Sequence, residues 1–197
     1  MLNMPIGKNA ALKSELIDYF INNGSIQQGD FVGKSGNHYS IETDIRCAFC
    51  NHLSALSTAK MLDRYITSIG VPDHPFIGVP ETGTLISFYL NQVRFDRCES
   101  NYSVNMMRAV AKEYQKETNT VFTVLPIDQT QSYILIEDDV VTGNTLVKYL
   151  RQAIGTGVKI EYVVSVFGRE SAKAVADFCS QNDIKYIEII DAKECEV

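Results

Sequence analysis

The stretch ILIEDDVVTGNTL, residues 134–146, holds the side chains best suited to chemistry. An apolar run typical of a buried strand leads into three carboxylates, Glu137, Asp138 and Asp139, and then into a turn that opens a helix. The backbone N–H groups at a helix N-terminus attract anions, and the Thr142 and Thr145 hydroxyls can donate to a phosphate. Adjacent carboxylates can accept hydrogen bonds from sugar hydroxyls or help to hold Mg²⁺. The segment therefore predicts a site for a phosphorylated pentose, whereas helix capping by the acids is the purely structural alternative.

Helices and strands alternate around this segment. Apolar residues at helical spacing predict helices over residues 9–22, 53–69, 146–154 and 172–179, and from the turn at 80–84 through 90. Short apolar runs predict strands over residues 76–79, 133–136, 160–167 and 184–190, with possible strands over 102–107 and 121–125. This order is typical of an α/β fold with a central parallel sheet flanked by helices. Since ligands bind at the carboxyl ends of such strands, we expect the site at residues 79–84, 137–145 and 167–170.

The N-terminal region follows a different pattern. Tyr39, Ile41 and Thr43 alternate with polar residues, which predicts a half-buried strand, and residues 33–37 form a turn ahead of it. We expect a hairpin outside the main sheet. The chain is then one domain over 1–197, with a helix and hairpin hood at 1–46 and an α/β core at 47–197.

Composition excludes several classes of protein. The 197 residues include 18 Lys+Arg and 24 Asp+Glu, for a formal net charge of −6, and 45% are hydrophobic. No apolar run approaches the ~20 residues that span a bilayer, and the N-terminus lacks the pattern of a secretion signal. An acidic chain without a basic block is poorly suited to nucleic acid. We expect a cytoplasmic protein that binds neither nucleic acid nor membrane.

The cysteines suit a reducing compartment. They are five in number and scattered, and only Cys47 and Cys50 form a close pair. A zinc site would need two more ligands, and only His52 lies nearby; a redox site would need a thioredoxin-like context. We expect this pair to lie at a strand-to-helix junction, with metal or redox chemistry as the minor alternative.

Residues 134–146 resemble the signature for phosphoribosyl pyrophosphate (PRPP) in type I phosphoribosyltransferases. The resemblance implies that Asp138 and Asp139 face the ribose hydroxyls, and these two acids are also our candidate Mg²⁺ ligands. It further implies that the 5-phosphate is surrounded by Thr142, Gly143, Asn144 and Thr145. Asn144 stands where the family usually has Gly, and because Asn tolerates a positive φ the turn can persist.

Four further segments, in the right order, resemble orotate phosphoribosyltransferases. They are KSGNHYS with TDIR in the hood, GVPETGT as the pyrophosphate loop, MRAVAKEY as the mobile catalytic loop, and VFGRE, whose arginine binds the orotate carboxylate in the family. The resemblance assigns catalytic roles to Arg108 and Lys112. It assigns substrate binding to Lys34, His38, Glu81, Thr82, Gly83, Thr84 and Arg169.

The chemistry of these side chains agrees with that resemblance. A guanidinium such as that of Arg169 matches a planar carboxylate in bidentate fashion, and a purine offers it no such group. Arg108, Lys112 and Lys116 are four residues apart and form a basic stripe, which is either a solvated helix face or part of a loop over 108–120 that closes on pyrophosphate. In the family this loop reaches the neighbouring subunit, which implies a homodimer with shared sites.

Several positions depart from the family pattern. Tyr114 replaces a histidine, Ala109 a frequent basic residue and His38 a frequent lysine, the proline after the hood serine is missing, and Glu81 adds a carboxylate where phosphates bind. Because stabilisation of the transition state comes from positioning and from neutralised pyrophosphate, lost cations slow transfer before they abolish PRPP binding. The leading hypothesis is an orotate phosphoribosyltransferase. The alternatives are a phosphoribosyltransferase for another base, a PRPP-binding regulatory paralogue and, remotely, an unrelated α/β enzyme such as a methyltransferase.

Overall fold

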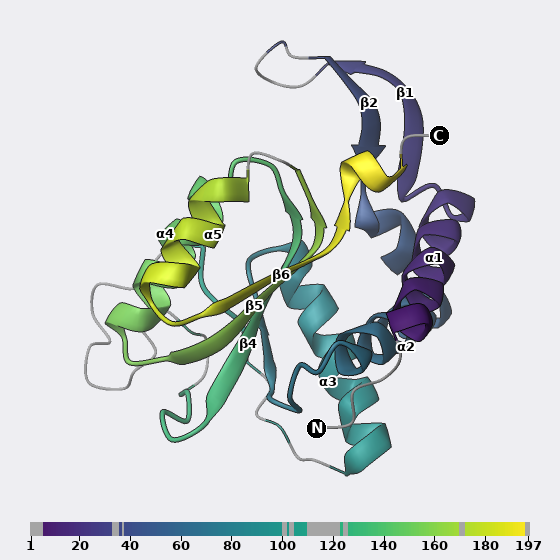
Figure 1. Cartoon of the computed structure of the whole chain (residues 1–197). Helices are drawn as coiled ribbons and strands as arrows, with labels where there is room; N and C mark the ends of the chain where they lie inside the picture. The colour runs from purple at the N-terminus through teal and green to yellow at the C-terminus, as the bar shows by residue number, and fades with distance from the viewer. Residues whose placement is uncertain are drawn as a thin grey trace.

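A four-stranded parallel sheet forms the centre of the molecule, and a separate antiparallel hairpin lies beyond one end of it (Figure 1). The computed structural model describes residues 6–32, 36, 38–99, 102, 105–109, 123, 126–169 and 172–195. The helices and strands, in chain order, are α1 (Ile6–Asn22), β1 (Ile26–Val32), β2 (His38–Thr43), η1 (Ile45–Phe49), α2 (His52–Ser68), β3 (Phe76–Gly78), α3 (Thr82–Cys98), β4 (Ser132–Val140), α4 (Asn144–Gly155), β5 (Lys159–Gly168), α5 (Lys173–Gln181), β6 (Lys185–Asp191) and η4 (Ala192–Cys195).

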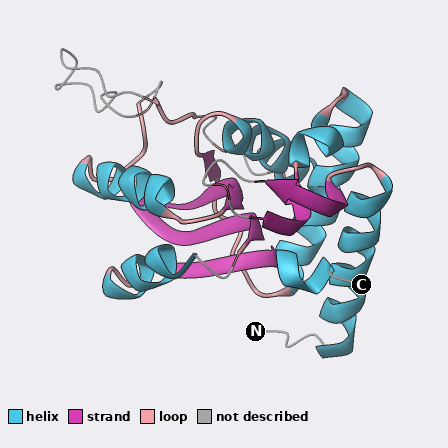
Figure 2. Cartoon of the chain, turned by 90° about the horizontal axis from the view of Figure 1, so that it is seen from above, coloured by secondary structure: helices cyan, strands magenta, loops and turns pink. Residues whose placement is uncertain are grey.

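The sheet runs in the order β3-β4-β5-β6 and is covered by helices on both faces (Figure 2). Alternation along β4 explains the two layers, because successive side chains of a strand point to opposite faces. Ile134 and Ile136 join the core cluster that also contains residues of α1, α2 and α3. Tyr133 and Leu135 join the cluster formed with α4 and α5. The predicted α/β class and its central parallel sheet are confirmed.

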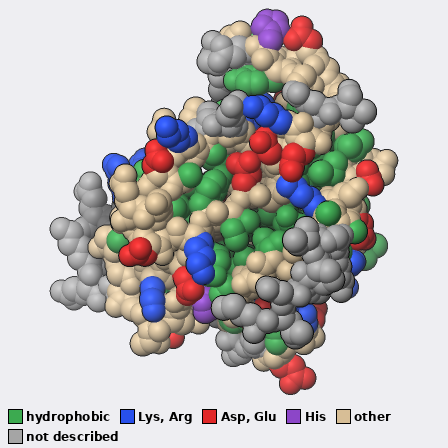
Figure 3. Space-filling model, in the orientation of Figure 1, with side chains coloured by type: hydrophobic (Ala, Val, Ile, Leu, Met, Phe, Trp, Pro, Cys, Tyr) green, Lys and Arg blue, Asp and Glu red, His purple; other side chains and the backbone are tan. Residues whose placement is uncertain are grey.

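The hairpin of β1 and β2 stands over the carboxyl edge of the sheet as a hood (Figure 1). The C-terminal turn η4 packs against its base, where Gln28 donates to the carbonyl of Cys195 at 2.9 Å. Lys13 of α1 pairs with Glu194 of η4 at 2.7 Å. Acidic side chains gather on this face just below the hairpin (Figure 3). Both ends of the described chain therefore brace the hood.

Helix α3 differs from the expectation for its segment. It begins at Thr82, inside the predicted turn, and runs to Cys98 rather than ending near residue 90. The reason is that its inner face is polar in the second half. The Asn91 amide bonds both the N–H and the carbonyl of Phe76, at 2.8 and 2.9 Å. An apolar periodicity cannot detect such a face.

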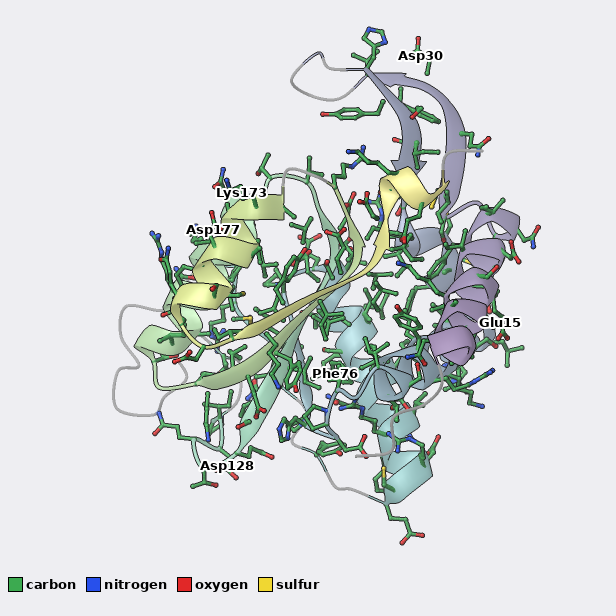
Figure 4. The ribbon with its side chains drawn as sticks, viewed as in Figure 1. Glu15, Asp30, Phe76, Asp128, Lys173 and Asp177 are labelled. Atoms are coloured by element: carbon green, nitrogen blue, oxygen red, sulfur yellow. The ribbon has the colours of Figure 1, made fainter. Side chains whose placement is uncertain are left out.

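Arg94 is a second buried polar residue in this half of α3, and its side chain is 0% exposed. Its Nε donates to Asp63 of α2 at 2.9 Å, and its guanidinium carbon lies 4.2 Å from the centroid of the Phe76 ring, which is labelled at the centre of Figure 4. Arg97, one turn later, bonds both Asp63 and the more exposed Asp73. This ion-pair network joins α2 and α3 to the segment before β3.

Among the described residues between α3 and β4, two isolated bridges are formed. Met106 forms a parallel bridge with Gly78, and Met107 an antiparallel bridge with Thr123. Most of the possible strand at 121–125 and part of that at 102–107 lie outside the described residues. Within the described part of the chain, all five cysteines are free, no three metal-ligating side chains converge, and no helix has the length and apolar character needed to cross a bilayer.

Candidate active site

Strand β4 delivers the acidic segment to the carboxyl edge of the sheet. The strand extends to Val140, four residues beyond the predicted end, so all three acids lie within it. Glu137 and Asp139 line the same cavity, whereas Asp138 is not among its lining residues and its charge acts on Arg46 in η1. Strand alternation thus places Glu137 and Asp139 on the cavity side, while Asp138 still interacts with both of them.

The cavity has a volume of about 260 Å³, and the segment from β4 to α4 forms its wall. Its lining residues are Glu137, Asp139, Val140, Val141, Thr142, Gly143, Thr145 and Leu146. The N-terminus of α4 opens onto this space, so its first N–H groups and the two threonine hydroxyls are available to an anion. The predicted phosphate turn is therefore a concave site.

Gly143, rather than Asn144, carries the unusual backbone of this turn. Gly143 precedes α4 with φ +76°, while Asn144 is already helical. A β-carbon at position 143 would overlap Cγ2 of Val175 in α5. The expectation that Asn144 needs a positive φ was wrong, because the left-handed position falls one residue earlier, where glycine is present.

The pKa values of the two acids that line the cavity, Glu137 and Asp139, are both raised. Burial, reinforced by Asp138, raises the pKa of Glu137 to about 10. Burial also raises the pKa of Asp139, against a hydrogen bond from Thr43 and the charge of Arg169, which lower it. Glu137 Oε2 and Asp139 Oδ1 are buried without a hydrogen-bond partner. Buried oxygens without a partner are costly, so a hydrogen-bond donor from a ligand or from water would stabilise them.

The hood contributes directly to this site. Thr43 Oγ1 donates to Asp139 Oδ2 at 2.8 Å, and the Arg169 guanidinium carbon lies 4.7 Å from the centroid of the Tyr39 ring. Arg169 Nη2 lies 4.0 Å from Asp139 Oδ2. The hood and the ends of β4 and β5 therefore meet around one carboxylate and one guanidinium.

The loop after β3 lies next to the same cavity. Val79 donates to the carbonyl of Ile136 at 3.0 Å, and a β-carbon at Gly83 would lie 2.5 Å from that carbonyl oxygen, so only glycine fits there. Thr84 closes the loop by donating to the Val79 carbonyl at 3.0 Å. Burial raises the pKa of Tyr149 in α4, and the charges of Glu137 and Glu81 add to the increase, so Glu81 lies near α4. Residues 80–84 thus face the turn at 141–145.

Known proteins with this arrangement are phosphoribosyltransferases. No protein-family model matches the sequence. A curated orotate phosphoribosyltransferase from Methanococcus maripaludis is 25% identical over 186 residues, which cover 93% of this chain and 94% of that protein. The orotate phosphoribosyltransferase structure from Francisella tularensis has a TM-score of 0.72 at 16% identity and covers 91% of this chain and 87% of its own.

Two further structures match. The Mycobacterium tuberculosis orotate phosphoribosyltransferase in complex with PRPP has a TM-score of 0.65 at 14% identity, covering 94% of this chain and 99% of its own. The Leishmania donovani UMP synthase has a TM-score of 0.67 at 18% identity; 92% of this chain matches only 36% of that longer one. This chain has the type I phosphoribosyltransferase fold.

Other predicted site residues lie elsewhere in this phosphoribosyltransferase fold. His38 is exposed near the far end of the hairpin and contacts Asp30, labelled in Figure 4, at 2.7 Å between Nδ1 and Oδ1. Arg108 Nε donates to the Thr123 carbonyl at 3.1 Å and does not line the cavity. Lys34 and Lys112 lie outside the described residues. Thr82 begins α3 directly after the loop that follows β3.

Glu137 and Thr43 line or contact the site of this phosphoribosyltransferase fold, although neither was assigned a role from the two motifs that contain them, ILIEDDVVTGNTL and TDIR. The family motif directs attention to Asp138 and Asp139, whereas strand alternation pairs positions 137 and 139. Thr43 was already on the inward face of a predicted strand, together with Tyr39 and Ile41. Only its contact with Asp139 could not be predicted, since it joins segments 96 residues apart.

Proposed function

We propose that this protein is an orotate phosphoribosyltransferase, which transfers ribose 5-phosphate from PRPP to orotate and releases orotidine 5′-monophosphate and pyrophosphate. The observation that carries the proposal is the position of Arg169, whose Nη2 lies 4.0 Å from Oδ2 of Asp139, a residue that lines the cavity at the N-terminus of α4. A cation for the orotate carboxylate thus lies next to an acid for the ribose. The similarity to the Methanococcus maripaludis enzyme supports this assignment.

Each part of PRPP has a complementary group in the chain. The 5-phosphate fits the N-terminus of α4, with the hydroxyls of Thr142 and Thr145 as further donors. A ribose hydroxyl can donate to Asp139 Oδ1, which has no partner in the described structure. The pyrophosphate lies toward residues 80–84, and we assign its neutralisation to Arg108 and Lys112 of the loop over 108–120.

The transfer exchanges one bond at the ribose C1 for another. The C1–O bond breaks, and its electron pair leaves with pyrophosphate. Orotate N1 loses its proton and forms the new bond to C1. The chain accelerates this exchange by holding the two reactants in line and by surrounding the leaving group with cations.

Mg²⁺ is the proposed cofactor, with Asp138 and Asp139 as candidate ligands. Carboxylate oxygens suit Mg²⁺, and the unpartnered Asp139 Oδ1 offers one, but the described residues bring no third ligand to them. The metal would therefore take its remaining oxygens from water and from PRPP. When bound, it would neutralise charge on the pyrophosphate.

The test is the loss of orotate absorbance with PRPP and Mg²⁺, compared with mixtures that lack PRPP or contain EDTA. Loss only in the complete mixture supports the proposal and its metal requirement. If PRPP is consumed with another base but not with orotate, that base rather than orotate is the acceptor.

A PRPP-binding protein without transfer is the second candidate. Glu81, exposed in the pyrophosphate loop, favours it because a carboxylate there repels the leaving group. Calorimetry distinguishes the two, since binding of PRPP with Mg²⁺ in the absence of turnover on any base would identify this second function.

We also propose a homodimer with shared sites. Apolar side chains are exposed on α2 and α3, which pack together: Leu53 is 76% exposed, Phe95 47% and Leu85 38%. Such side chains suit a contact between copies. Light scattering on the purified protein would give the number of subunits.

A further inference from the structure

One face of β2 connects the hood to both halves of the proposed substrate site. Tyr39, Ile41 and Thr43 share this face because strand side chains alternate. Ile41 is buried in the core and fixes the strand. On either side of it, Tyr39 lies against the Arg169 guanidinium and Thr43 bonds Asp139. The strand thus holds a group for the base and a group for the ribose at a fixed separation.

The two oxygens of Asp139 have different surroundings. Oδ2 accepts the Thr43 hydroxyl at 2.8 Å, whereas Oδ1 is buried and has no partner. A buried acceptor without a partner is unfavourable in the free protein. Because Thr43 occupies Oδ2, the carboxylate is held with Oδ1 left for an incoming donor.

Arg169 lies close to the same carboxylate without bonding it. The separation of 4.0 Å between Nη2 and Oδ2 exceeds a hydrogen bond, and Arg169 Nε is buried without a partner. A guanidinium beside a free carboxylate oxygen would close onto it in a bidentate pair. The Thr43 hydroxyl holds the Asp139 carboxylate in an orientation that leaves Arg169 Nη2 at 4.0 Å, so Arg169 does not close onto it and its donors stay available.

We propose that Thr43 is a positioning residue that sets Asp139 Oδ1 toward the ribose and keeps Arg169 free for the carboxylate of the base. The inference rests on the proposed function for the identity of these two ligands. The structural part of the inference does not depend on that function: the Thr43 hydroxyl bonds Asp139 Oδ2, and Oδ1 is left for a donor of the ligand. Loss of the hydroxyl lets Asp139 rotate and pair with Arg169.

The test compares Thr43→Val, which keeps the shape, with Thr43→Ser, which keeps the hydroxyl. Thr67→Val, on the exposed face of α2, is the matched control. Calorimetry gives the Kd values of ribose 5-phosphate and of inorganic pyrophosphate in separate titrations, and initial rates give the orotate KM. We expect Thr43→Val to weaken the binding of ribose 5-phosphate about tenfold and to raise the orotate KM by a similar factor. The pyrophosphate affinity of Thr43→Val should stay within about twofold of wild type. Thr43→Ser should retain the wild-type affinities and KM, and the Thr67→Val control should bind both ligands as wild type does.

Two results would overturn the inference. One is a Thr43→Val protein that binds ribose 5-phosphate as tightly as wild type. The other is an equal loss for ribose 5-phosphate and pyrophosphate with a lowered Tm, which would mean a merely structural role. The proposed function fails separately, if wild type binds ribose 5-phosphate but does not convert orotate; the Thr43 comparison on ribose 5-phosphate then still decides the inference. A wild type that binds no ribose 5-phosphate overturns both.

Discussion

The α-carbon of Gly143 lies against the side chain of Val175, so that the turn before α4 and the first turn of α5 leave no room for a β-carbon. This contact fixes the N-terminus of α4 at the cavity. The positive φ of +76° is a second reason why any residue other than glycine is unfavourable at position 143.

Gly143→Ala should therefore lose anion binding. The new methyl group overlaps Val175 and favours a different φ, which costs about 1–3 kcal/mol and moves the first N–H groups of α4. Calorimetry with inorganic phosphate should show at least a tenfold weaker Kd. Gly155→Ala, at the end of α4 with open space around it, is the control and should keep wild-type affinity. Unchanged phosphate binding by Gly143→Ala would remove the anion site from this turn.

Arg169→Ala should separate the two substrates. Removing the guanidinium deletes the proposed partner of the orotate carboxylate and leaves the phosphate turn intact, so the orotate KM should rise more than tenfold and the PRPP KM less than about threefold. Initial rates at varied concentrations of each substrate give both values. Arg151→Ala, on the exposed face of α4, is the matched control. Equal increases in both KM values would contradict the role of Arg169 in base binding.

Strand and helix positions in the core follow from sequence because they rest on local periodicity. Ile134 and Ile136 can be assigned to one sheet face from the alternation along their strand alone. The exceptions share one physical cause. Arg94 and Asn91 are polar residues whose burial depends on partners far along the chain, and the contact of Thr43 with Asp139 is equally remote. Local patterns carry no information on such pairings.

Glu137→Gln should stabilise the protein increasingly as the pH rises. The pKa of this carboxyl is raised from 4.5 to about 10, so between these values the unfolded chain ionises it while the folded protein keeps it protonated. The unfolded state then binds fewer protons, and stability falls with rising pH. The amide of the variant cannot ionise, which removes this loss. The Tm difference between variant and wild type, measured from pH 5 to pH 9, should widen steadily.

Glu42→Gln, on the exposed side of β2, is the control for that series and should show no such trend. A Tm difference for Glu137→Gln that stays constant over the same range would mean that Glu137 titrates normally in the folded protein.

Asp63→Asn should destabilise the fold far more than Asp73→Asn. Asp63 is 3% exposed and is the buried carboxylate that bonds Arg94, so neutralising it removes the hydrogen-bonded countercharge of a buried guanidinium and leaves it the more distant Asp73, at 3.7 Å. Breaking a buried pair in this way costs about 3–5 kcal/mol. Asp73 pairs with Arg97 in a half-exposed position, where a single pair contributes about 1 kcal/mol or less. Urea unfolding of both variants gives the comparison, and equal losses would contradict the buried network.

Two inactive variants should restore activity to each other if the proposed dimer shares its sites. In a heterodimer of Lys112→Ala and Asp139→Asn, one site receives both altered residues and the other receives neither. Random reassembly of an equal mixture should therefore recover about a quarter of wild-type activity, since half of the dimers have one intact site of two. Lys112→Ala mixed with Arg108→Ala is the control, because both changes lie in the proposed loop over 108–120 and every site then carries one of them. Recovery in the first mixture alone would place the loop in the neighbouring subunit, whereas recovery in neither would confine it to its own.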